Sequence, residues 1–265
     1  MSRFACQEQL LPGATLEEKW EFAVGAGFQA IELRGRGGFA FRDRLPELRR
    51  AAAAGVVMPT VCVEMAHFFG AFDPGLRADA IEQLKSQLSV IAEIGGQGAM
   101  TPASYGMFSR RLPPFEPPRD EAGDREVLLA GLAELGEHAA AEGVRLYLEP
   151  LNRYEDHMVN RLEQAADLIE ATGLDSIRIA ADTYHMNIEE DDPATALLRA
   201  ARYVGHVHVS ESNRAQPGTG HIDWPAVLAA LTATGYDGYL VLECRLRGEA
   251  AAALGEVPTF LRRAS

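Results

Sequence analysis

Four short apolar segments in the second half of the chain end in side chains that can bind a metal ion or move a proton. The segments are LYLE, IAAD, HVHV and LVLE, and the side chains are Glu149, Asp182, His208 and Glu243. Three carboxylates crowded together without a cation would force one of them to stay protonated. A divalent cation removes that penalty. Oxygen ligands with one imidazole suit Mn²⁺, Mg²⁺ or Co²⁺ better than a thiolate-bound zinc.

The HVHV segment contains two histidines at alternate positions. We expect His206 and His208 to point to opposite sides of a strand, so that only one of them faces the site. The phase favours His208, because Val207 and Val209 would then pack toward the helices. His206 is interpreted as a core or supporting histidine that lies one layer deeper in the barrel.

The elements that must position these side chains alternate between short apolar runs and longer amphipathic ones, which predicts βα units around a parallel sheet. The expected helices cover residues 15–26, 44–53, 74–94, 121–142, 160–171, 192–201, 223–233 and 249–263. The expected strands cover residues 3–6, 30–33, 56–63, 98–101, 144–149, 177–181, 203–209 and 238–243.

Eight strands each followed by a helix favour a single (β/α)₈ TIM barrel over a doubly wound sheet, with residues 1–265 as one domain. In such a barrel the active site lies at the carboxyl ends of the strands, where the four predicted ligands would converge. The irregular segment 111–120 follows the fourth strand on that side, where it could cover the substrate or be a plain surface loop.

The composition excludes several classes of protein. The chain has 265 residues, of which 47% are hydrophobic, and a formal net charge of −13, which disfavours binding to nucleic acid or anionic membranes. No apolar run approaches the length of a membrane span, and the N-terminus has no secretory signal. Three widely spaced cysteines form no disulfide framework, so we expect a cytoplasmic protein.

Three motifs resemble the xylose-isomerase-like sugar isomerase and epimerase superfamily, and especially the D-tagatose and D-allulose (ketose) 3-epimerases. They are EPLNRYE at 149–155, DTYHMNIEE at 182–190 and HVSESNRAQPGTGHIDW at 208–224, and Glu243 completes the set. The resemblance extends over nearly the whole chain, although the specific motifs lie in its second half.

The resemblance implies roles for individual residues. It implies metal ligands at Glu149, Asp182, His208 and Glu243, and it implies substrate contacts for Glu155, His185 and Arg214. It further implies one divalent cation per subunit, with Mn²⁺ the first choice and Mg²⁺ or Co²⁺ the others, and a homo-oligomer, either a dimer or a tetramer. Glu155 could instead form a salt bridge with Arg153.

The reaction implied is the epimerisation or isomerisation of a small sugar, and a ketose 3-epimerase is the first expectation. A cation would stabilise the enediolate that forms when a proton leaves the carbon beside a carbonyl. Glu149 and Glu243 could act as base and acid on opposite faces of the sugar. The same groups would serve a lyase or dehydratase acting on a keto-inositol or keto-sugar, or an isomerase of a small hydroxy-carbonyl acid such as hydroxypyruvate.

Several positions depart from the ketose-epimerase pattern. Glu243 is followed by Cys244 and Arg245 rather than by proline and an aromatic residue, and the first strand ends in CQE rather than an aromatic residue. Arg34, Arg36 and Arg245 could recognise a carboxylate or phosphate, or could be ordinary loop arginines. The roles of Glu64 and His67 stay open.

Two further classes of function deserve comparison. A DNA-repair endonuclease of the endonuclease IV type shares the barrel, but it needs several metal ions, more histidines than the seven present and a basic surface. A binding module without catalysis would not need the complete ligand set. The sequence therefore favours a sugar-converting enzyme over a DNA-repair endonuclease and over a binding module.

Overall fold

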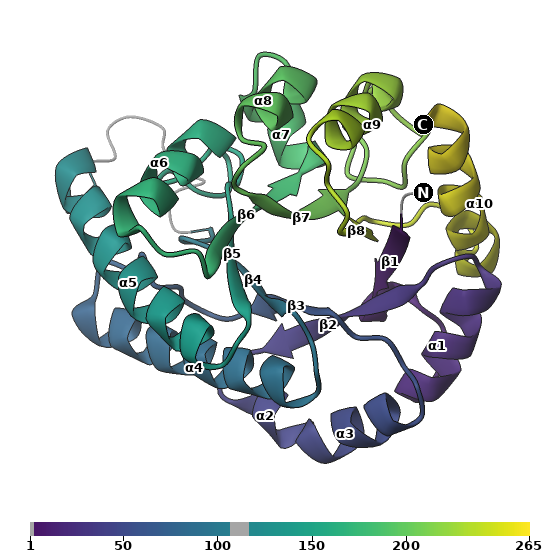
Figure 1. Cartoon of the computed structure of the whole chain (residues 1–265), viewed down its shortest axis with the longest axis horizontal. Helices are drawn as coiled ribbons and strands as arrows, with labels where there is room; N and C mark the ends of the chain where they lie inside the picture. The colour runs from purple at the N-terminus through teal and green to yellow at the C-terminus, as the bar shows by residue number, and fades with distance from the viewer. Residues whose placement is uncertain (1–2, 107–116) are drawn as a thin grey trace.

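Eight parallel strands pair in chain order and close into a barrel, because β1 also pairs with β8 (Figure 1). The structure, a computed structural model, describes residues 3–106 and 117–265. Most of the segment 111–120 therefore lies outside the described residues. The strands are β1 (Arg3–Gln7), β2 (Ala30–Arg36), β3 (Thr60–Glu64), β4 (Gly98–Pro102), β5 (Arg145–Glu149), β6 (Ile177–Asp182), β7 (Val204–Val209) and β8 (Tyr239–Leu242). The predicted (β/α)₈ barrel is confirmed.

Helices surround the barrel, as Figure 1 shows. They are the 3₁₀ helix η1 (Glu8–Leu10), α1 (Leu16–Gly25), α2 (Ala40–Asp43), α3 (Leu45–Ala53), α4 (Pro74–Glu93), α5 (Glu121–Ala141), α6 (Leu162–Thr172), α7 (Thr183–Glu189), α8 (Pro193–Arg199), α9 (Trp224–Ala233) and α10 (Ala250–Ala264). The prediction missed α7, which starts directly after β6. It also began the third strand at residue 56, whereas β3 begins at Thr60.

Aspartate caps fix where several helices begin. The side chains of Asp73, Asp120, Asp182 and Asp223 each accept a backbone N–H from the first turn of the helix that follows. Such a cap satisfies one of the unpaired N–H groups at a helix start and stabilises the helix by ~1 kcal/mol. Asp182 therefore acts both as the last residue of β6 and as the cap of α7, which holds its carboxylate at the strand end.

The hydrophobic core lies mainly between the strands and the surrounding helices, and large side chains such as Phe4, Leu84 and Trp224 are fully buried there. The inside of the barrel differs, because it also contains charged and polar groups. Glu32, His206 and His208 are all buried within it. Burying such groups is costly unless they find partners, which makes this cluster a candidate for function.

One irregularity in the sheet matters for the site. Ile179 of β6 pairs with Val204, but the next residue, Ala180, pairs with His206, so the register shifts by one residue along β7. Because of this shift, Asp182 lies opposite His208 rather than opposite Val207. Both side chains therefore point into the barrel at the same level.

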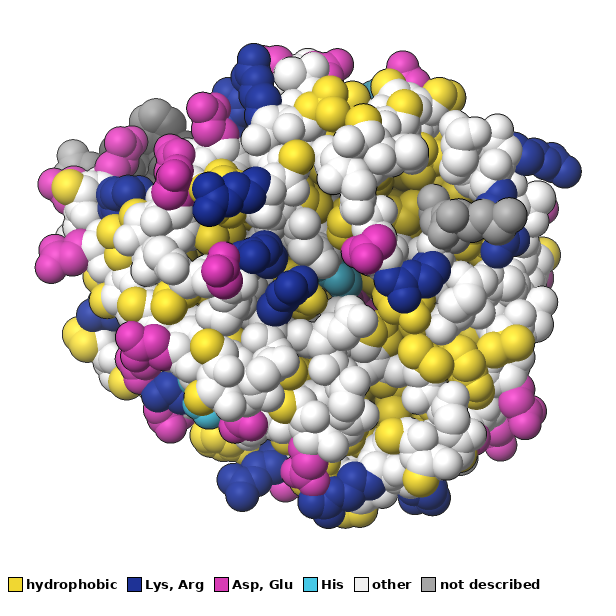
Figure 2. Space-filling model, in the orientation of Figure 1, with side chains coloured by type: hydrophobic (Ala, Val, Ile, Leu, Met, Phe, Trp, Pro, Cys, Tyr) yellow, Lys and Arg dark blue, Asp and Glu magenta, His cyan; other side chains and the backbone are white. Residues whose placement is uncertain are grey.

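Charge of both signs is spread over the face of the molecule shown in Figure 2, and acidic and basic side chains both occur at its edge and near its middle. Within residues 3–106 and 117–265, no helix combines the length and apolar composition needed to cross a membrane. All three cysteines are free.

Candidate metal centre and active site

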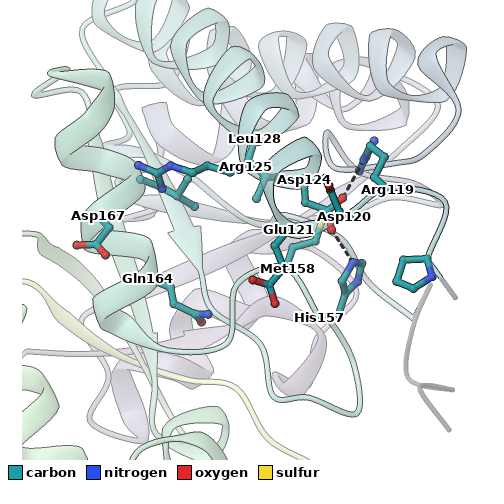
Figure 3. A pocket seen from close by; sticks show the side chains of 12 residues that line it. Arg119, Asp120, Glu121, Asp124, Arg125, Leu128, His157, Met158, Gln164 and Asp167 are labelled. Atoms are coloured by element: carbon teal, nitrogen blue, oxygen red, sulfur yellow. Dashed lines mark hydrogen bonds and ion pairs between the residues drawn. The ribbon is translucent and has the colours of Figure 1, made fainter. Parts of the chain in front are cut away.

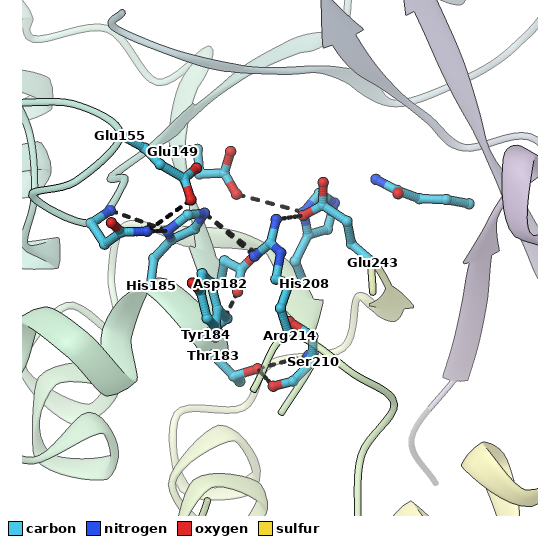
Figure 4. A network of polar contacts seen from close by, with 12 residues as sticks. Glu149, Glu155, Asp182, Thr183, Tyr184, His185, His208, Ser210, Arg214 and Glu243 are labelled. Carbon is cyan, nitrogen blue, oxygen red and sulfur yellow. Dashed lines mark hydrogen bonds and ion pairs between the residues drawn. The ribbon is translucent and has the colours of Figure 1, made fainter. Parts of the chain in front are cut away.

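The four predicted metal ligands meet at the carboxyl ends of four consecutive strands. Glu149 is the last residue of β5, Asp182 is the last of β6, His208 is the last but one of β7, and Glu243 follows β8 directly. One ligand atom from each lies within 4.8 Å of those of all the others. Figure 4 shows the side chains converging. The arrangement expected from sequence is therefore present in the structure.

The imidazole of His208 lies at the centre of this cluster. Its Nδ1 is 3.0 Å from Oε2 of Glu243 and 3.6 Å from Oε1 of Glu149. His208 and Asp182 have no exposed side-chain surface, whereas 21% of the Glu243 side chain is exposed. The ligand set is thus buried on three sides and open on the side of Glu243.

The donor atoms fit a divalent cation. Oε1 of Glu149 is buried and has no hydrogen-bond partner among the described residues, so it has a lone pair that an ion would satisfy. Burial, together with the charges of Glu243 and Asp182, raises the pKa of Glu149 to about 8. Burial also raises the pKa of Asp182 to about 6, although Arg214 opposes this shift. A bound cation would relieve both penalties.

Arg214 extends from the loop after β7 into the same cluster. Its guanidinium donates to Oδ2 of Asp182 at 2.7 Å and to Oε2 of Glu243 at 3.0 Å, and it stacks over the ring of Tyr184 at 4.7 Å. The residue has a positive φ of 59°, which is rare for a side chain other than glycine or asparagine. From this uncommon backbone conformation the side chain reaches two of the predicted ligands.

His185 and Glu155 lie on the side of the cluster nearest β5. Nδ1 of His185 accepts the backbone N–H of Asn152 at 3.1 Å, and Nε2 lies 3.4 Å from the guanidinium of Arg214. Burial lowers the pKa of His185 to about 3, so the ring is neutral at neutral pH. The side-chain amide of Asn152 donates to Glu155 at 3.1 Å. Arg153 pairs with Glu189 instead, so the suggested Arg153–Glu155 salt bridge is not formed.

A cavity of about 500 Å³ opens beside the ligand cluster. Its lining has an apolar part and a polar part. The lining includes Glu149, Glu155, His185, Arg214 and Glu243, so all three predicted substrate contacts and two predicted ligands face the same space. The apolar part consists of Val63, Met65, Phe68, Met100, Pro102, Tyr105 and Leu151.

The arginines that were open to interpretation divide into two groups. Arg34 lines the cavity, but its guanidinium forms an ion pair with Glu64, which also lines it. Arg36 and Arg245 are exposed and do not line the cavity. His67 pairs with Asp79 at 2.6 Å and also lies outside the lining.

Sequence reasoning missed Glu32 and misjudged His206. Side chains repeat every two residues along a strand, so His206 and His208 point to the same side, into the barrel. The expectation of opposite faces was wrong, although His206 does lie deeper than the cluster. The carboxylate of Glu32 contacts both rings, at 2.9 and 2.8 Å. The signal available was a charged residue inside the apolar run AIEL.

A second depression of about 650 Å³ lies outside the barrel mouth, along α5 and α6 (Figure 3). Three of its polar side chains contact one another: Asp124 accepts from Arg119 at 2.8 Å and contacts His157 at 2.9 Å. Arg119 also donates to the backbone oxygens of Gly70 and Ala71. These contacts fix the start of α5 to neighbouring loops, which is a structural role.

The fold and the site together define a class: a (β/α)₈ barrel whose mouth contains a carboxylate and imidazole cluster able to hold a cation beside an open cavity. The profile of the xylose isomerase-like TIM barrel family matches residues 20–264. The chain belongs to this family, which confirms the resemblance found in the sequence.

Individual relatives are also similar over most of the chain. A 3-dehydro-D-guloside 4-epimerase of Escherichia coli (strain K12) is 37% identical over 248 residues, which are 93% of this chain and 94% of the relative. An L-ribulose 3-epimerase of Mesorhizobium japonicum is 38% identical over 173 residues, which are 64% of this chain and 56% of the relative. The crystal structure of a 3-keto-D-glucoside 4-epimerase from E. coli superposes with a TM-score of 0.93 at 36% identity, covering 99% of this chain and all of the other.

Proposed function

We propose that the protein is a metal-dependent sugar epimerase that inverts a hydroxyl-bearing carbon next to a ketone. The observation that supports this most directly is the convergence of Glu149, Asp182, His208 and Glu243 beside a cavity large enough for a sugar. The named relatives are sugar epimerases, which supports the same class of reaction. A lyase, a dehydratase or a hydroxypyruvate isomerase is not favoured.

The charges in the cavity favour a neutral sugar over a phosphorylated or acidic one. Both arginines of the lining, Arg34 and Arg214, are already paired with carboxylates. A phosphate dianion needs net positive charge around it, and arginines that are neutralised by carboxylates do not supply it, although their remaining N–H groups can still donate to the oxygens of a sugar. Hydroxyl groups can both donate and accept, so they match a wall that contains acids, arginines and a neutral histidine.

The residues of the site can be given specific tasks. Glu149, Asp182, His208 and Glu243 would hold the cation, which would polarise the carbonyl and the neighbouring hydroxyl of the sugar. Glu149 and Glu243 approach from the ends of β5 and β8, so one can remove the carbon-bound proton on one face. The electron pair of that C–H bond moves into the carbonyl and leaves an enediolate.

The other carboxylate then returns a proton to the opposite face of the same carbon, which restores the carbonyl with inverted configuration. No oxidant or reductant is needed. Arg214 lies between Asp182 and Glu243 and can stabilise negative charge on the sugar oxygens. His185, whose ring is neutral, can bind sugar hydroxyls, and so can Glu155, since both residues line the cavity.

The comparisons support two candidate substrates. A 3-keto-glycoside inverted at C4 is favoured by the relative and the structure that cover almost the whole chain. It also agrees with the departures from the ketose-epimerase pattern at the ends of the first and last strands. A free ketose inverted at C3 is the second candidate, and the similarity to the L-ribulose 3-epimerase supports it.

The decisive experiment incubates the Mn²⁺-loaded protein with each substrate in deuterated water. We expect one deuterium at C4 and the C4 epimer from a 3-keto-glycoside. Deuterium at C3 of a free ketose would select the second candidate. Loss of water, seen as a decrease in mass, or the absence of exchange on every neutral keto-sugar would contradict the proposal.

Variants test the two proposed acid–base residues. Glu149→Gln and Glu243→Gln should each lower kcat by at least ~100-fold, because general acid–base catalysis contributes about 10²–10⁴-fold. Glu8→Gln is the matched control: Glu8 is a buried carboxylate that pairs with Arg44 at 2.7 Å and does not line the cavity. Full activity in either of the first two variants would contradict its role.

Three further proposals concern the bound metal ion, the oligomeric state and the location of the protein in the cell. We propose Mn²⁺ as the bound ion, because three carboxylates and one imidazole form a mostly hard ligand set. We also propose a homo-oligomer and a cytoplasmic location. Elemental analysis of protein purified without added metal and light scattering test the first two directly.

A further inference from the structure

Below the ligand cluster, Glu32 of β2 lies fully buried at the centre of a second group of polar side chains. Its Oε2 is 2.8 Å from Nε2 of His208 and accepts from the amide of Gln7 at 3.1 Å. Its Oε1 accepts from the hydroxyl of Thr60 at 2.8 Å and lies 2.9 Å from Nε2 of His206. Each of these contacts comes from a group that donates or can donate a proton.

This arrangement determines how the His208 ring is used. A carboxylate offers only acceptors, so the nitrogen that faces it, Nε2, must carry the proton. The opposite nitrogen, Nδ1, faces Glu243 and Glu149, which are themselves predicted ligands, so a bound ion would replace the proton on Nδ1 while Nε2 keeps its own. The orientation of Glu32 therefore selects both the tautomer of His208 and the nitrogen that can act as the ligand.

Burial makes the contact strong and specific. Glu32 and His208 have no exposed side-chain surface, so water cannot replace either partner. The other oxygen of Glu32 is held by Thr60 and contacts His206, which prevents the carboxylate from rotating away. A hydrogen bond to a charged acceptor is stronger than one between two neutral groups.

We propose that Glu32 is the positioning residue of the metal centre: it holds the Nε2–H of His208 so that Nδ1 faces the ion, and His206 and Thr60 hold Glu32 in place. This inference rests on the metal dependence in the proposed function. Glu32 contacts neither the cavity nor the other three predicted ligands, so its effect on the ion passes through His208. It links β2 to an ion that the ends of β5 to β8 would hold.

The test measures metal binding rather than turnover. Isothermal titration of the metal-free protein with Mn²⁺ should give a dissociation constant about 10- to 100-fold higher for Glu32→Gln than for the wild type, the range found when partners of metal-bound histidines are removed. The control Glu8→Gln also removes a buried carboxylate, and it should leave the affinity within about threefold of the wild-type value.

A second measurement is made on the wild-type protein, which is known to fold if it binds the ion. Proton–nitrogen NMR of the Mg²⁺-loaded wild type should show His208 protonated at Nε2 and not at Nδ1, with the proton shifted downfield by the carboxylate. In a folded Glu32→Gln variant that resonance should move upfield. The resonance is assigned to His208 if it is missing from the spectrum of the His208→Asn variant.

The outcomes separate this inference from the proposed function. A Glu32→Gln variant that binds Mn²⁺ as tightly as the wild type, or an Nδ1-protonated His208, would overturn the role of Glu32 alone. A wild-type protein that binds no Mn²⁺ would overturn the metal centre and this inference together. Normal metal binding without any deuterium exchange would contradict the epimerase proposal and leave Glu32 in its role.

Discussion

Glu149 and Glu243 have the same side chain but opposite electrostatic surroundings. Burial raises the pKa of Glu149 to about 8. For Glu243, burial acts in the same direction, but the positive charges of Arg214 and His208 outweigh it and lower the pKa well below its usual value. Two carboxyl groups whose environments separate their pKa values are suited to different acid–base tasks. In the proposed mechanism, the neighbours of Glu149 and Glu243, and not the residue type, would decide which of the two removes the proton and which returns it.

The raised pKa of Glu149 predicts a pH-dependent metal affinity. Between pH 6 and 8 the metal-free protein still holds a proton on Glu149, and a cation must displace it. His208 adds to this, because Glu32 and Glu243 overcome the effect of burial and raise its pKa well above the ordinary value. The apparent affinity for Mn²⁺ should therefore rise with pH over this interval, by up to about tenfold per unit for each proton displaced.

Calorimetry in two buffers of different ionisation enthalpy measures the number of protons released along with the affinity. The release should be largest near pH 6 and should decline toward pH 8 and above. An affinity that stays constant between pH 6 and 8 would show that Glu149 is already ionised in the metal-free protein.

At the scale of elements, the loop between β7 and α9 positions Arg214, and a single carboxylate organises that loop. The side chain of Glu211 accepts the backbone N–H groups of Ser212, Gly218 and Ile222 and the indole N–H of Trp224, at 2.6–3.2 Å. Glu211 is 1% exposed, so all of these donors depend on it. The loop held in this way places Arg214 so that its guanidinium reaches Asp182 and Glu243.

Glu211→Gln should therefore impair the site without removing a residue that touches it. An amide has one acceptor oxygen, so at least one buried N–H loses its partner, at a cost of about 1–3 kcal/mol in the free energy of unfolding. We expect a lower kcat/KM, because Arg214 is less well placed, with a metal affinity close to that of the wild type. Urea unfolding, steady-state kinetics and metal titration measure the three quantities.

The exposed carboxylate Glu256 of α10 offers a control for this variant. Glu256→Gln makes the same chemical change where no buried donors are involved, and its stability should lie within about 0.5 kcal/mol of the wild type. If Glu211→Gln behaved in the same way as Glu256→Gln, the loop would not depend on that carboxylate.

At the scale of the whole molecule, the site exists only because the barrel closes. Gly98 begins β4 in the wall of the barrel, and a Cβ atom built on it would collide with the backbone oxygen of Arg145 on β5. It would also meet the ring of Tyr147 at 2.7 Å. Since backbone atoms of a closed sheet cannot move independently, a larger residue at this position must separate β4 from β5.

Gly98→Ala should accordingly destabilise the protein by about 1–3 kcal/mol, the usual cost of overpacking, and should lower activity through a displaced Glu149. Gly255→Ala in α10 is the matched control, because its Cβ would meet no atom within 4 Å. Alanine should stabilise that helix by about 0.5–1 kcal/mol. Thermal unfolding of both variants provides the comparison, and equal melting temperatures would contradict the argument.

The sequence alone predicted the barrel and the four residues, Glu149, Asp182, His208 and Glu243, that converge at its mouth. Alternating apolar and amphipathic runs reveal βα units, and Glu149, Asp182 and Glu243 stand at the ends of apolar runs where the pattern of burial changes. These are local properties of the chain, so they can be predicted from neighbouring residues. Glu155, His185 and Arg214, which the family resemblance predicts to contact the substrate, all line the same cavity, and their contact with the substrate stays a prediction.

Tertiary structure decided the contacts between distant segments. The register shift that places Asp182 opposite His208, the pairing of Arg34 with Glu64 and the burial of Glu32 beneath His208 all join residues from different strands. No periodicity within one strand specifies such a pairing, because register depends on how all eight strands pack together as the barrel closes. The sequence therefore predicts which groups can do the chemistry, and only the closed barrel fixes how each of them is held.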